Sequence, residues 1–177
     1  MQIKNSKNHF GLVAIIFHWL MAILLIGLLT LGLYMVGLPI SLEKLKFYGW
    51  HKEYGILALI LVTLRIIWRL ANITPQLSLP LLEKIAARAV HWAFYGFMFA
   101  MPITGWLITS AAGIPASFFG LFNLPSLIAA RPDSLELFEA IHKWIAYGLI
   151  VTIILHTLAA LKHHFINKDD ILRRMFP

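Results

Sequence analysis

Four long apolar blocks, separated by shorter polar segments, dominate the pattern of hydrophobic and polar positions along this chain. The blocks cover about residues 11–38, 51–70, 85–110 and 140–164. Each approaches or exceeds the roughly 20 residues that a helix needs to cross the hydrocarbon core of a bilayer. The pattern therefore predicts an all-α fold, a transmembrane four-helix bundle that forms one integral-membrane domain over residues 1–177.

The segments between the blocks are short and marked by Pro and Gly. The longest one, residues 111–135, contains several Phe and Pro residues, and we expect it to lie on the bilayer surface as a short amphipathic piece. A cleaved signal peptide is an alternative for the N-terminus, but the first block is about twice as long as the usual apolar region and no small-residue cleavage site follows it. We therefore expect residues 11–38 to form the first membrane helix.

Composition and charge agree with a multi-pass membrane protein. Hydrophobic residues make up 60% of the chain and charged residues 13%, whereas soluble domains have about 25% charged residues. The net charge of +7 gathers beside one set of helix ends, and the positive-inside rule then places both termini in the cytoplasm. The charge is thus a topology signal, and we expect the lipid bilayer, and no nucleic acid, as a partner.

The lack of cysteine narrows the possible cofactor chemistry. The chain contains 0 Cys, which excludes disulfides, thiolate-bound metals, iron–sulfur clusters and haem attached through a C-x-x-C-H motif. Any haem would therefore be held without a covalent attachment, by His or Met.

Four histidines fall where the predicted helices would bring them together in two layers. His142 and His156 are fourteen residues apart, which is about 21 Å of helix and nearly four full turns, so they share one face. His18 lies near the cytoplasmic start of the first block, and His51 opens the second block at its outer end. Sorted by depth, the four residues form the pairs His18 with His156 and His51 with His142.

Two facing histidines on neighbouring helices form a socket for a flat macrocycle that is ligated from both sides. A single histidine in a membrane helix is more often explained by core packing or an interhelical hydrogen bond, but four matched by depth and face favour ligands. Zinc is a weaker alternative, because the predicted spans hold a single acidic residue, Glu53 at the outer end of the second span, and two histidines leave zinc under-coordinated. The same shortage of carboxylates argues against a transporter of protons or metal ions.

Three basic residues are candidates for binding the anionic propionates of haem. Arg65 lies fourteen residues after His51, on nearly the same face and at the depth of the cytoplasmic pair. Lys52 and Lys143 each directly follow an outer histidine. The alternative for all three is snorkelling to the interface and anchoring of the helices.

Two more histidines are candidates for catalytic proton transfer at the cytoplasmic end. His163 lies seven residues after His156, about 20° from the same face. His91 faces either a neighbouring helix or the edge of an inner haem. A titratable imidazole beside a haem suits quinone reduction, which consumes protons as well as electrons. For His163 the alternative is an interfacial histidine on a polar helix end.

The segments that carry these histidines resemble one family. FHWL in the first block, WHKEYGIL at the start of the second, RAVHWAFYGFMFAMPITGWL in the third and HKW…LHTLAALKHHFINKDDILRRM in the fourth are similar to the bacterial cytochrome b(561) family. The resemblance covers nearly the whole chain. It implies a cytochrome of the bacterial inner membrane with two non-covalent b-type haems, with His18, His51, His142 and His156 as the axial ligands, and electron exchange with the ubiquinone pool.

The resemblance leaves the outer electron partner open. One branch of the family is a superoxide oxidase, which passes electrons from periplasmic superoxide to quinone, but the outer segments here carry no net positive charge that would concentrate this anion. We expect a di-haem b cytochrome that moves single electrons between ubiquinone and a periplasmic donor or acceptor, with superoxide as a candidate. The alternative is a haem-bearing membrane anchor that exchanges electrons with a separate periplasmic protein at the apolar segment 111–135.

Overall fold

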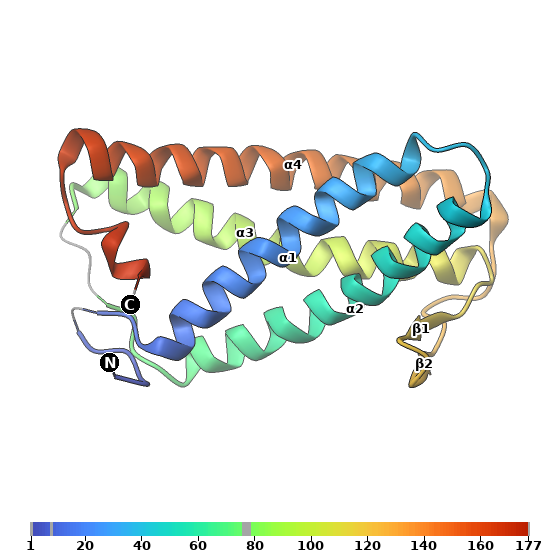
Figure 1. Cartoon of the computed structure of the whole chain (residues 1–177), viewed down its shortest axis with the longest axis horizontal. Helices are drawn as coiled ribbons and strands as arrows, with labels where there is room; N and C mark the ends of the chain where they lie inside the picture. Colours follow the sequence, from blue (N-terminus) through green and yellow to red (C-terminus); the bar gives the residue numbers. More distant parts are fainter. Residues whose placement is uncertain (1, 8, 76–78, 177) are drawn as a thin grey trace.

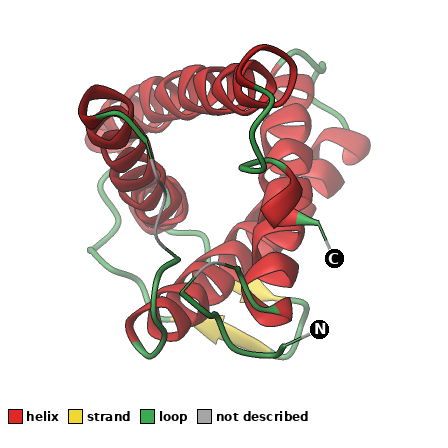
Figure 2. Cartoon of the chain, turned by 90° about the vertical axis from the view of Figure 1, so that its left-hand side faces the viewer, coloured by secondary structure: helices red, strands yellow, loops and turns green. Residues whose placement is uncertain are grey.

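Four long antiparallel helices form the fold in the computed structural model, which describes residues 2–7, 9–75 and 79–176 (Figure 1). They are α1 (Leu12–Val36), α2 (Leu42–Leu70), α3 (Leu81–Ala111) and α4 (Leu135–Lys162). α1 packs against α2, α2 against α3 and α3 against α4, and an end-on view shows the helices around a common axis (Figure 2). The predicted all-α bundle is confirmed.

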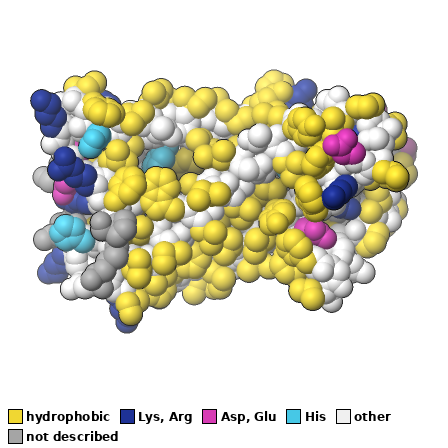
Figure 3. Space-filling view, viewed as in Figure 1, with side chains coloured by type: hydrophobic (Ala, Val, Ile, Leu, Met, Phe, Trp, Pro, Cys, Tyr) yellow, Lys and Arg dark blue, Asp and Glu magenta, His cyan; other side chains and the backbone are white. Residues whose placement is uncertain are grey.

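Both termini lie at the same end of the bundle (Figure 1). On the face shown in Figure 3, Lys and Arg side chains dominate this end, whereas acidic and basic side chains mix at the other. By the positive-inside rule the end with the termini is cytoplasmic. The connections α1–α2 and α3–α4 are therefore at the outer end.

Within the described residues, three helical segments are long and apolar enough to cross a membrane: Leu12–Val36, Leu81–Ala111 and Pro132–Asn167. The fourth helix, α2, has 29 residues and runs beside the others (Figure 1), but its uncharged stretch covers only residues 54–64. Its charged side chains lie toward the two ends of the helix, where they are near the interfaces of a bilayer.

Three helices begin earlier than the apolar blocks suggested. α2 begins at Leu42 and not near residue 51, because Ser41 caps it: the Ser41 hydroxyl accepts a hydrogen bond of 3.1 Å from the backbone N–H of Lys44, which satisfies one of the unpaired donors of the first turn. α3 begins directly after Pro80, and α4 follows the 3-10 turn η1 (Pro132–Ser134). These polar first turns extend the helices beyond the hydrophobic pattern.

The structure gives a defined secondary structure to residues 111–135, which we expected to be a short amphipathic piece on the bilayer surface. The segment forms an antiparallel hairpin of β1 (Ala116–Phe118) and β2 (Phe122–Leu124). Phe119 and Gly120 turn the chain with positive φ angles of 48° and 70°, and the Phe119 ring packs edge-on against Tyr54 of α2 at 5.3 Å. Two strands of three residues each, joined by a turn that contains Gly120, form this hairpin.

Buried apolar side chains fill the bundle interior between its two ends. Met21, Val62 and Met98 form the most buried cluster. On α4, Gly148 lies under the ring of Phe97, because a Cβ at this glycine would approach Phe97 Cζ to 2.8 Å. α3 and α4 therefore pack closely at mid-height, and this apolar layer separates the polar groups of the two ends.

The cytoplasmic end of α4 continues into a π-helical turn, η2 (His163–Asn167), and the chain then reverses at Lys168, which has a positive φ of 54°. A short 3-10 turn, η3 (Arg173–Met175), follows. The C-terminal segment thereby returns toward α1 (Figure 1).

Candidate functional site

At the outer end of the bundle, His51 of α2 and His142 of α4 face each other. Their ring centroids are 6.2 Å apart, with the planes at 79°. Gly32 of α1 lies against His51, since a Cβ there would be 3.1 Å from His51 Cε1, and Gly105 of α3 lies against His142 at 3.5 Å. Gly32 thus leaves room for the His51 imidazole, whereas a Cβ at Gly105 would make only an ordinary contact with His142.

The ring nitrogens of this outer pair have different surroundings. His142 Nδ1 lies 2.8 Å from the hydroxyl of Thr104, a buried residue of α3. His51 Nδ1 is buried and has no hydrogen-bond partner among the described residues. A buried polar atom without a partner is costly, so its presence in a bundle interior marks a place where a further group is expected.

At the cytoplasmic end, three imidazoles meet. The ring centroid of His156 on α4 lies 6.1 Å from that of His18 on α1 and 6.0 Å from that of His91 on α3. The ring of Phe94 stands edge-on to His156 at 5.2 Å. The inner layer therefore contains the predicted pair, His18 and His156, and brings His91 to it as a third ring.

A cavity of about 60 Å³ opens beside His18, and Arg65, Trp68, Arg69 and Tyr95 line it. The Arg69 guanidinium lies 5.5 Å from the centre of the Tyr95 ring, and Arg65 lines the same cavity as this tyrosine. Trp68 Nε1 is buried without a hydrogen-bond partner among the described residues. Two guanidinium groups and an unused N–H donor suit a ligand with anionic or carbonyl oxygens.

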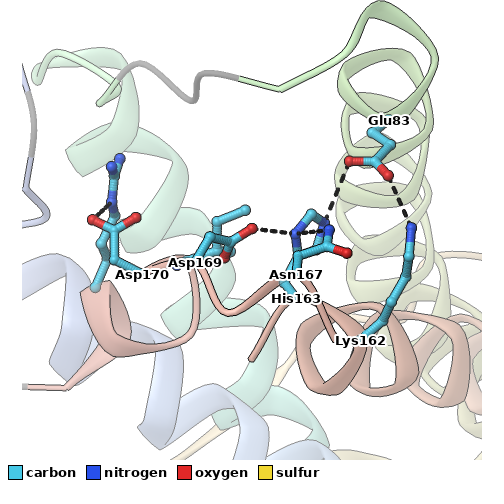
Figure 4. A network of polar contacts seen from close by, with 8 residues as sticks. Glu83, Lys162, His163, Asn167, Asp169 and Asp170 are labelled. Carbon is cyan, nitrogen blue, oxygen red and sulfur yellow. Dashed lines mark hydrogen bonds and ion pairs between the residues drawn. The ribbon is translucent and has the colours of Figure 1, made fainter. Parts of the chain in front are cut away.

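His163 stands between two carboxylates at the end of α4 (Figure 4). Its Nδ1 lies 2.6 Å from Asp169 Oδ2, and its Nε2 lies 3.8 Å from Glu83 Oε2 on α3. Glu83 Oε1 in turn accepts a 2.9 Å hydrogen bond from Lys162. The His163 ring is buried while Glu83 is partly exposed, so this network, which we call the His163 cluster (Glu83, Lys162, His163, Asn167 and Asp169), links a buried imidazole to the cytoplasmic surface.

The two outer lysines lie at the margin of the outer histidine pair. Lys143 is exposed, and its Nζ lies 6.0 Å from the centre of the Tyr147 ring on the same helix. Lys52 is half-buried and makes no hydrogen bond or ion pair with any described residue. Neither side chain lines a cavity beside a paired histidine, as Arg65 does.

Several residues of these layers were not predicted from the sequence. Thr104 and His142 are 38 positions apart, and Gly32 meets His51 across two helices, so neither contact leaves a periodic signal. The pairing of His163 with Asp169 depends on the π-helical turn and the reversal at Lys168. The sequence KDD at residues 168–170, shortly after His163, was the available hint, since a carboxylate close in sequence to a histidine often orients its ring.

Among the described residues, no three His, Asp or Glu side chains gather in a way that would hold a metal ion by themselves. The histidines are instead paired across the bundle, one pair toward each end. A helical membrane bundle with facing imidazoles in its interior is the arrangement that membrane cytochromes use to hold haem. The fold and the site thus define a membrane cytochrome.

Comparison with known proteins identifies the family. Residues 9–177 match the family model described as prokaryotic cytochrome b561, and the chain therefore belongs to the prokaryotic cytochrome b561 family. It is 38% identical to cytochrome b561 homolog 2 of Escherichia coli over 99% of this chain and 95% of that protein. It is 30% identical to cytochrome b561 homolog 1 of Escherichia coli over 96% and 98%, and 35% identical to the probable superoxide oxidase CybB of Yersinia pestis over 72% and 73%.

Family membership confirms several predictions made from the sequence. The chain is a membrane protein, it binds haem, and it belongs to a family that transfers electrons in membranes. The predicted family, the helical membrane bundle and the membrane location are confirmed.

Proposed function

We propose that the protein is a di-haem b-type cytochrome that moves single electrons across the membrane between a periplasmic donor or acceptor and ubiquinone. The observation that carries this proposal is the presence of two histidine pairs, each opposed across the bundle, at its opposite ends. On α4 their members, His142 and His156, are separated by about 21 Å of helix. This spacing spans most of a hydrocarbon core about 30 Å thick.

The distance between the rings supports bis-histidine ligation in each layer. A metal–imidazole bond is about 2 Å long and the bonded nitrogen lies about 1 Å from the ring centre, so two opposed ligands of one metal have centroids roughly 6 Å apart. The pairs have centroid separations of 6.1 Å for His18 with His156 and 6.2 Å for His51 with His142. The unpaired Nδ1 of His51 and the glycines beside the outer rings agree with a cofactor in this layer.

Haem b supplies reversible one-electron chemistry at its iron, and the surrounding residues determine where this chemistry takes place. The histidine pairs hold the two sites at opposite depths. The apolar side chains around Met21, Val62 and Met98 exclude water between the layers. Arg65, in the cavity beside His18, is the candidate that is best placed to bind inner propionates, and Lys52 and Lys143 are the candidates at the outer end.

Ubiquinone reduction requires protons, and the cytoplasmic end holds groups that can deliver them. In the His163 cluster the imidazole lies between Asp169 at 2.6 Å and Glu83 at 3.8 Å. We assign to His163 the catalytic transfer of a proton to quinone, with Glu83 as the group that exchanges protons with the cytoplasm. His91, beside His156, is the second candidate for proton chemistry there.

Superoxide is a candidate for the periplasmic electron donor. It is supported by the similarity to the Yersinia pestis protein named probable superoxide oxidase CybB. The balanced charge of the outer segments gives no electrostatic concentration of an anion there.

A second candidate function is that of a haem-bearing membrane anchor that exchanges electrons with a separate periplasmic protein. The β1–β2 hairpin favours it, because Leu121 and Phe122 at its tip are 76% and 51% exposed. Exposed apolar side chains at the outer end of the bundle are a surface that a partner protein would cover.

One experiment tests these proposals together. The purified protein should show a reduced-minus-oxidised haem b spectrum with about two haems per chain, and ubiquinol or superoxide should reduce it anaerobically without another protein. A preparation with a single haem would contradict the di-haem proposal. Reduction that occurs only after a periplasmic protein is added would favour the anchor function.

A further inference from the structure

The N-terminal segment folds back over the cytoplasmic end of α1. The backbone N–H of Leu12 donates to the carbonyl of Gln2 at 3.0 Å, and the N–H of Gly11 donates to Asn5 Oδ1 at 2.8 Å. Gly11 is needed at this point, because a Cβ there would collide with the backbone carbonyl of Ile3. The segment is therefore a fixed loop against the helix.

The C-terminal segment docks on the same end of α1. Trp19 Nε1 donates to the carbonyl of Met175 at 2.7 Å, and the ring of Phe176 packs against Trp19 at 5.2 Å. Arg174 Nε donates to Asp170 Oδ2 at 2.9 Å. These contacts hold the basic residues of η3 beside the N-terminal loop.

Between the two folded ends lies a cavity of about 360 Å³, a volume in the range of small-ligand sites. Its basic lining comes from both ends of the chain: Lys4, His9, Arg173 and Arg174. Its apolar lining is Phe10, Ile15 and Phe176. We call it the terminal cavity. The paired histidines and the His163 cluster do not line it, so the electron-transfer function does not account for it.

The charge of the terminal cavity is strongly positive. The nearby carboxylate, Asp170, is already engaged by Arg174, and the hydrogen bond from this guanidinium lowers the pKa of Asp170. Lys4 and Arg173 form no ion pair with any described residue. Arg and Lys side chains around a small cavity bind a phosphate group well, because charge-assisted hydrogen bonds to its oxygens are strong.

The apolar surroundings distinguish between a lipid phosphate and a free phosphate ion. Directly after Ile15 on α1, a stripe of large apolar side chains at helical spacing faces outward: Ile16, Leu20 and Ile23 are 53%, 45% and 70% exposed. Basic pockets at the cytoplasmic ends of membrane helices bind phospholipid headgroups. We propose that the terminal cavity binds the phosphate of an anionic phospholipid, whose acyl chains lie along this stripe of α1.

The test compares how well the purified, haem-loaded protein retains lipid in native mass spectrometry after reconstitution with equal amounts of phosphatidylglycerol and phosphatidylcholine. The wild-type protein should retain phosphatidylglycerol preferentially. A basic side chain that contacts the phosphate of a bound anionic lipid contributes about fivefold to its binding. Lys4→Gln and Arg173→Gln should each lower the preference by about this factor, and the double variant by about 30-fold.

The matched control is Lys84→Gln/Arg88→Gln, which removes the same charge from exposed positions at the cytoplasmic end of α3 and leaves the terminal cavity intact. It should change the preference by less than about twofold. An equal loss of the preference for phosphatidylglycerol in both double variants would overturn the proposal, because it would show that the lipid is attracted to the basic surface in general.

Two further measurements keep the proposal testable if the charge variants fold poorly. Gly11→Ala retains every charge but displaces the loop that carries Lys4, so it should also weaken the preference for phosphatidylglycerol. Inorganic phosphate at the same concentration as the lipid should not displace it. Complete displacement would show that the cavity recognises the phosphate ion alone, and would overturn the assignment to a lipid.

Discussion

The Thr104 hydroxyl lies 2.8 Å from Nδ1 of His142. The same oxygen is 2.8 Å from the carbonyl of Ala100 and 2.9 Å from that of Met101. Because the single hydroxyl proton is donated to one of these carbonyls, the oxygen is available to accept the Nδ1–H of His142. The ring is then fixed in the tautomer whose Nε2 lone pair is free for a metal.

This relationship predicts that Thr104→Val weakens haem binding in the outer layer. Valine keeps the shape of threonine but cannot accept the hydrogen bond, so the ring loses its fixed orientation and tautomer. Loss of such a partner typically lowers affinity by about 10- to 100-fold. Haem titration of the haem-depleted protein measures this, and Thr104→Ser should restore most of the affinity. Equal affinity in the valine variant would show that His142 is oriented by other contacts.

The two glycines beside the outer rings make a second, paired prediction. A Cβ at Gly32 would lie 3.1 Å from His51 Cε1, which is too close for an undisturbed ring, whereas a Cβ at Gly105 would lie at an ordinary 3.5 Å from His142 Cε1. Replacing either glycine by alanine raises the helix propensity by a similar amount, up to about 1 kcal/mol. A difference in haem affinity between the two variants therefore reports on the space beside the ring.

Gly32→Ala should therefore lower outer haem affinity by about tenfold, while Gly105→Ala should stay within about twofold of the wild type. The measurement is haem retention during dilution, followed in the absorption spectrum. If both variants behaved alike, the position of the His51 ring would not depend on the approach of α1.

The sequence was sufficient to predict the parts of the fold that follow from long periodic patterns. Four apolar blocks predicted the helices, and the spacing between His142 and His156 together with the alternating helix directions predicted which histidines would meet. The start of α2 at Leu42 was missed because its cap, Ser41, lies outside the apolar block. The hairpin was missed because three-residue strands are too short to show a period.

The contacts that depend on three dimensions could not be predicted in this way. The positions of His18 and His91 along their helices predict that both lie at the cytoplasmic end. They do not predict that both rings lie within about 6 Å of His156. Likewise, Lys4 and Arg173 line one cavity because both ends of the chain fold back. Hydrophobic periodicity carries no information about this folding back.

In the inner layer, His18 and His91 are both candidates for the ligand opposite His156, and we expect His18 to be the ligand. It lines the cavity that contains Arg65 and Trp68, where propionates can be bound. His18→Leu and His156→Leu should each lower the haem content from about two to about one per chain. His91→Leu should retain both haems and shift the reduction potential of the inner one, because a polar neighbour is lost.

Haem content by the pyridine haemochrome assay and potentiometric titration distinguish the two histidines. Loss of a haem in His91→Leu with retention in His18→Leu would reverse the assignment. Loss of both haems in every variant would indicate unfolding, which circular dichroism detects independently; the conservative replacements His18→Gln and His91→Gln then repeat the comparison.

The last prediction concerns the proton supply to quinone through the His163 cluster. Asp169 lies 2.6 Å from His163 Nδ1 and also accepts a hydrogen bond of 3.1 Å from the backbone N–H of Ile171. Asp169→Asn keeps the size of the side chain but removes the carboxylate that contacts His163 Nδ1 and orients the imidazole. General acid catalysis contributes about 10²- to 10⁴-fold to a rate, and loss of its supporting carboxylate should slow quinone reduction by at least about tenfold.

The neighbouring carboxylate provides the matched control. Asp170 pairs with Arg174 at 2.9 Å and does not contact His163, and the hydrogen bond from Arg174 holds the pKa of Asp170 below its ordinary value. Asp170→Asn therefore removes one full negative charge at neutral pH from the adjacent position, and should leave the rate within about twofold.

The rate is measured by mixing anaerobically reduced protein with a soluble ubiquinone and following haem oxidation, with ferricyanide as an acceptor that takes electrons without protons. A slower rate with quinone but not with ferricyanide in Asp169→Asn and His163→Gln would support proton transfer by His163. If both acceptors slowed equally, the two residues would act on the stability of the inner end of the bundle, and the catalytic assignment of His163 would be lost.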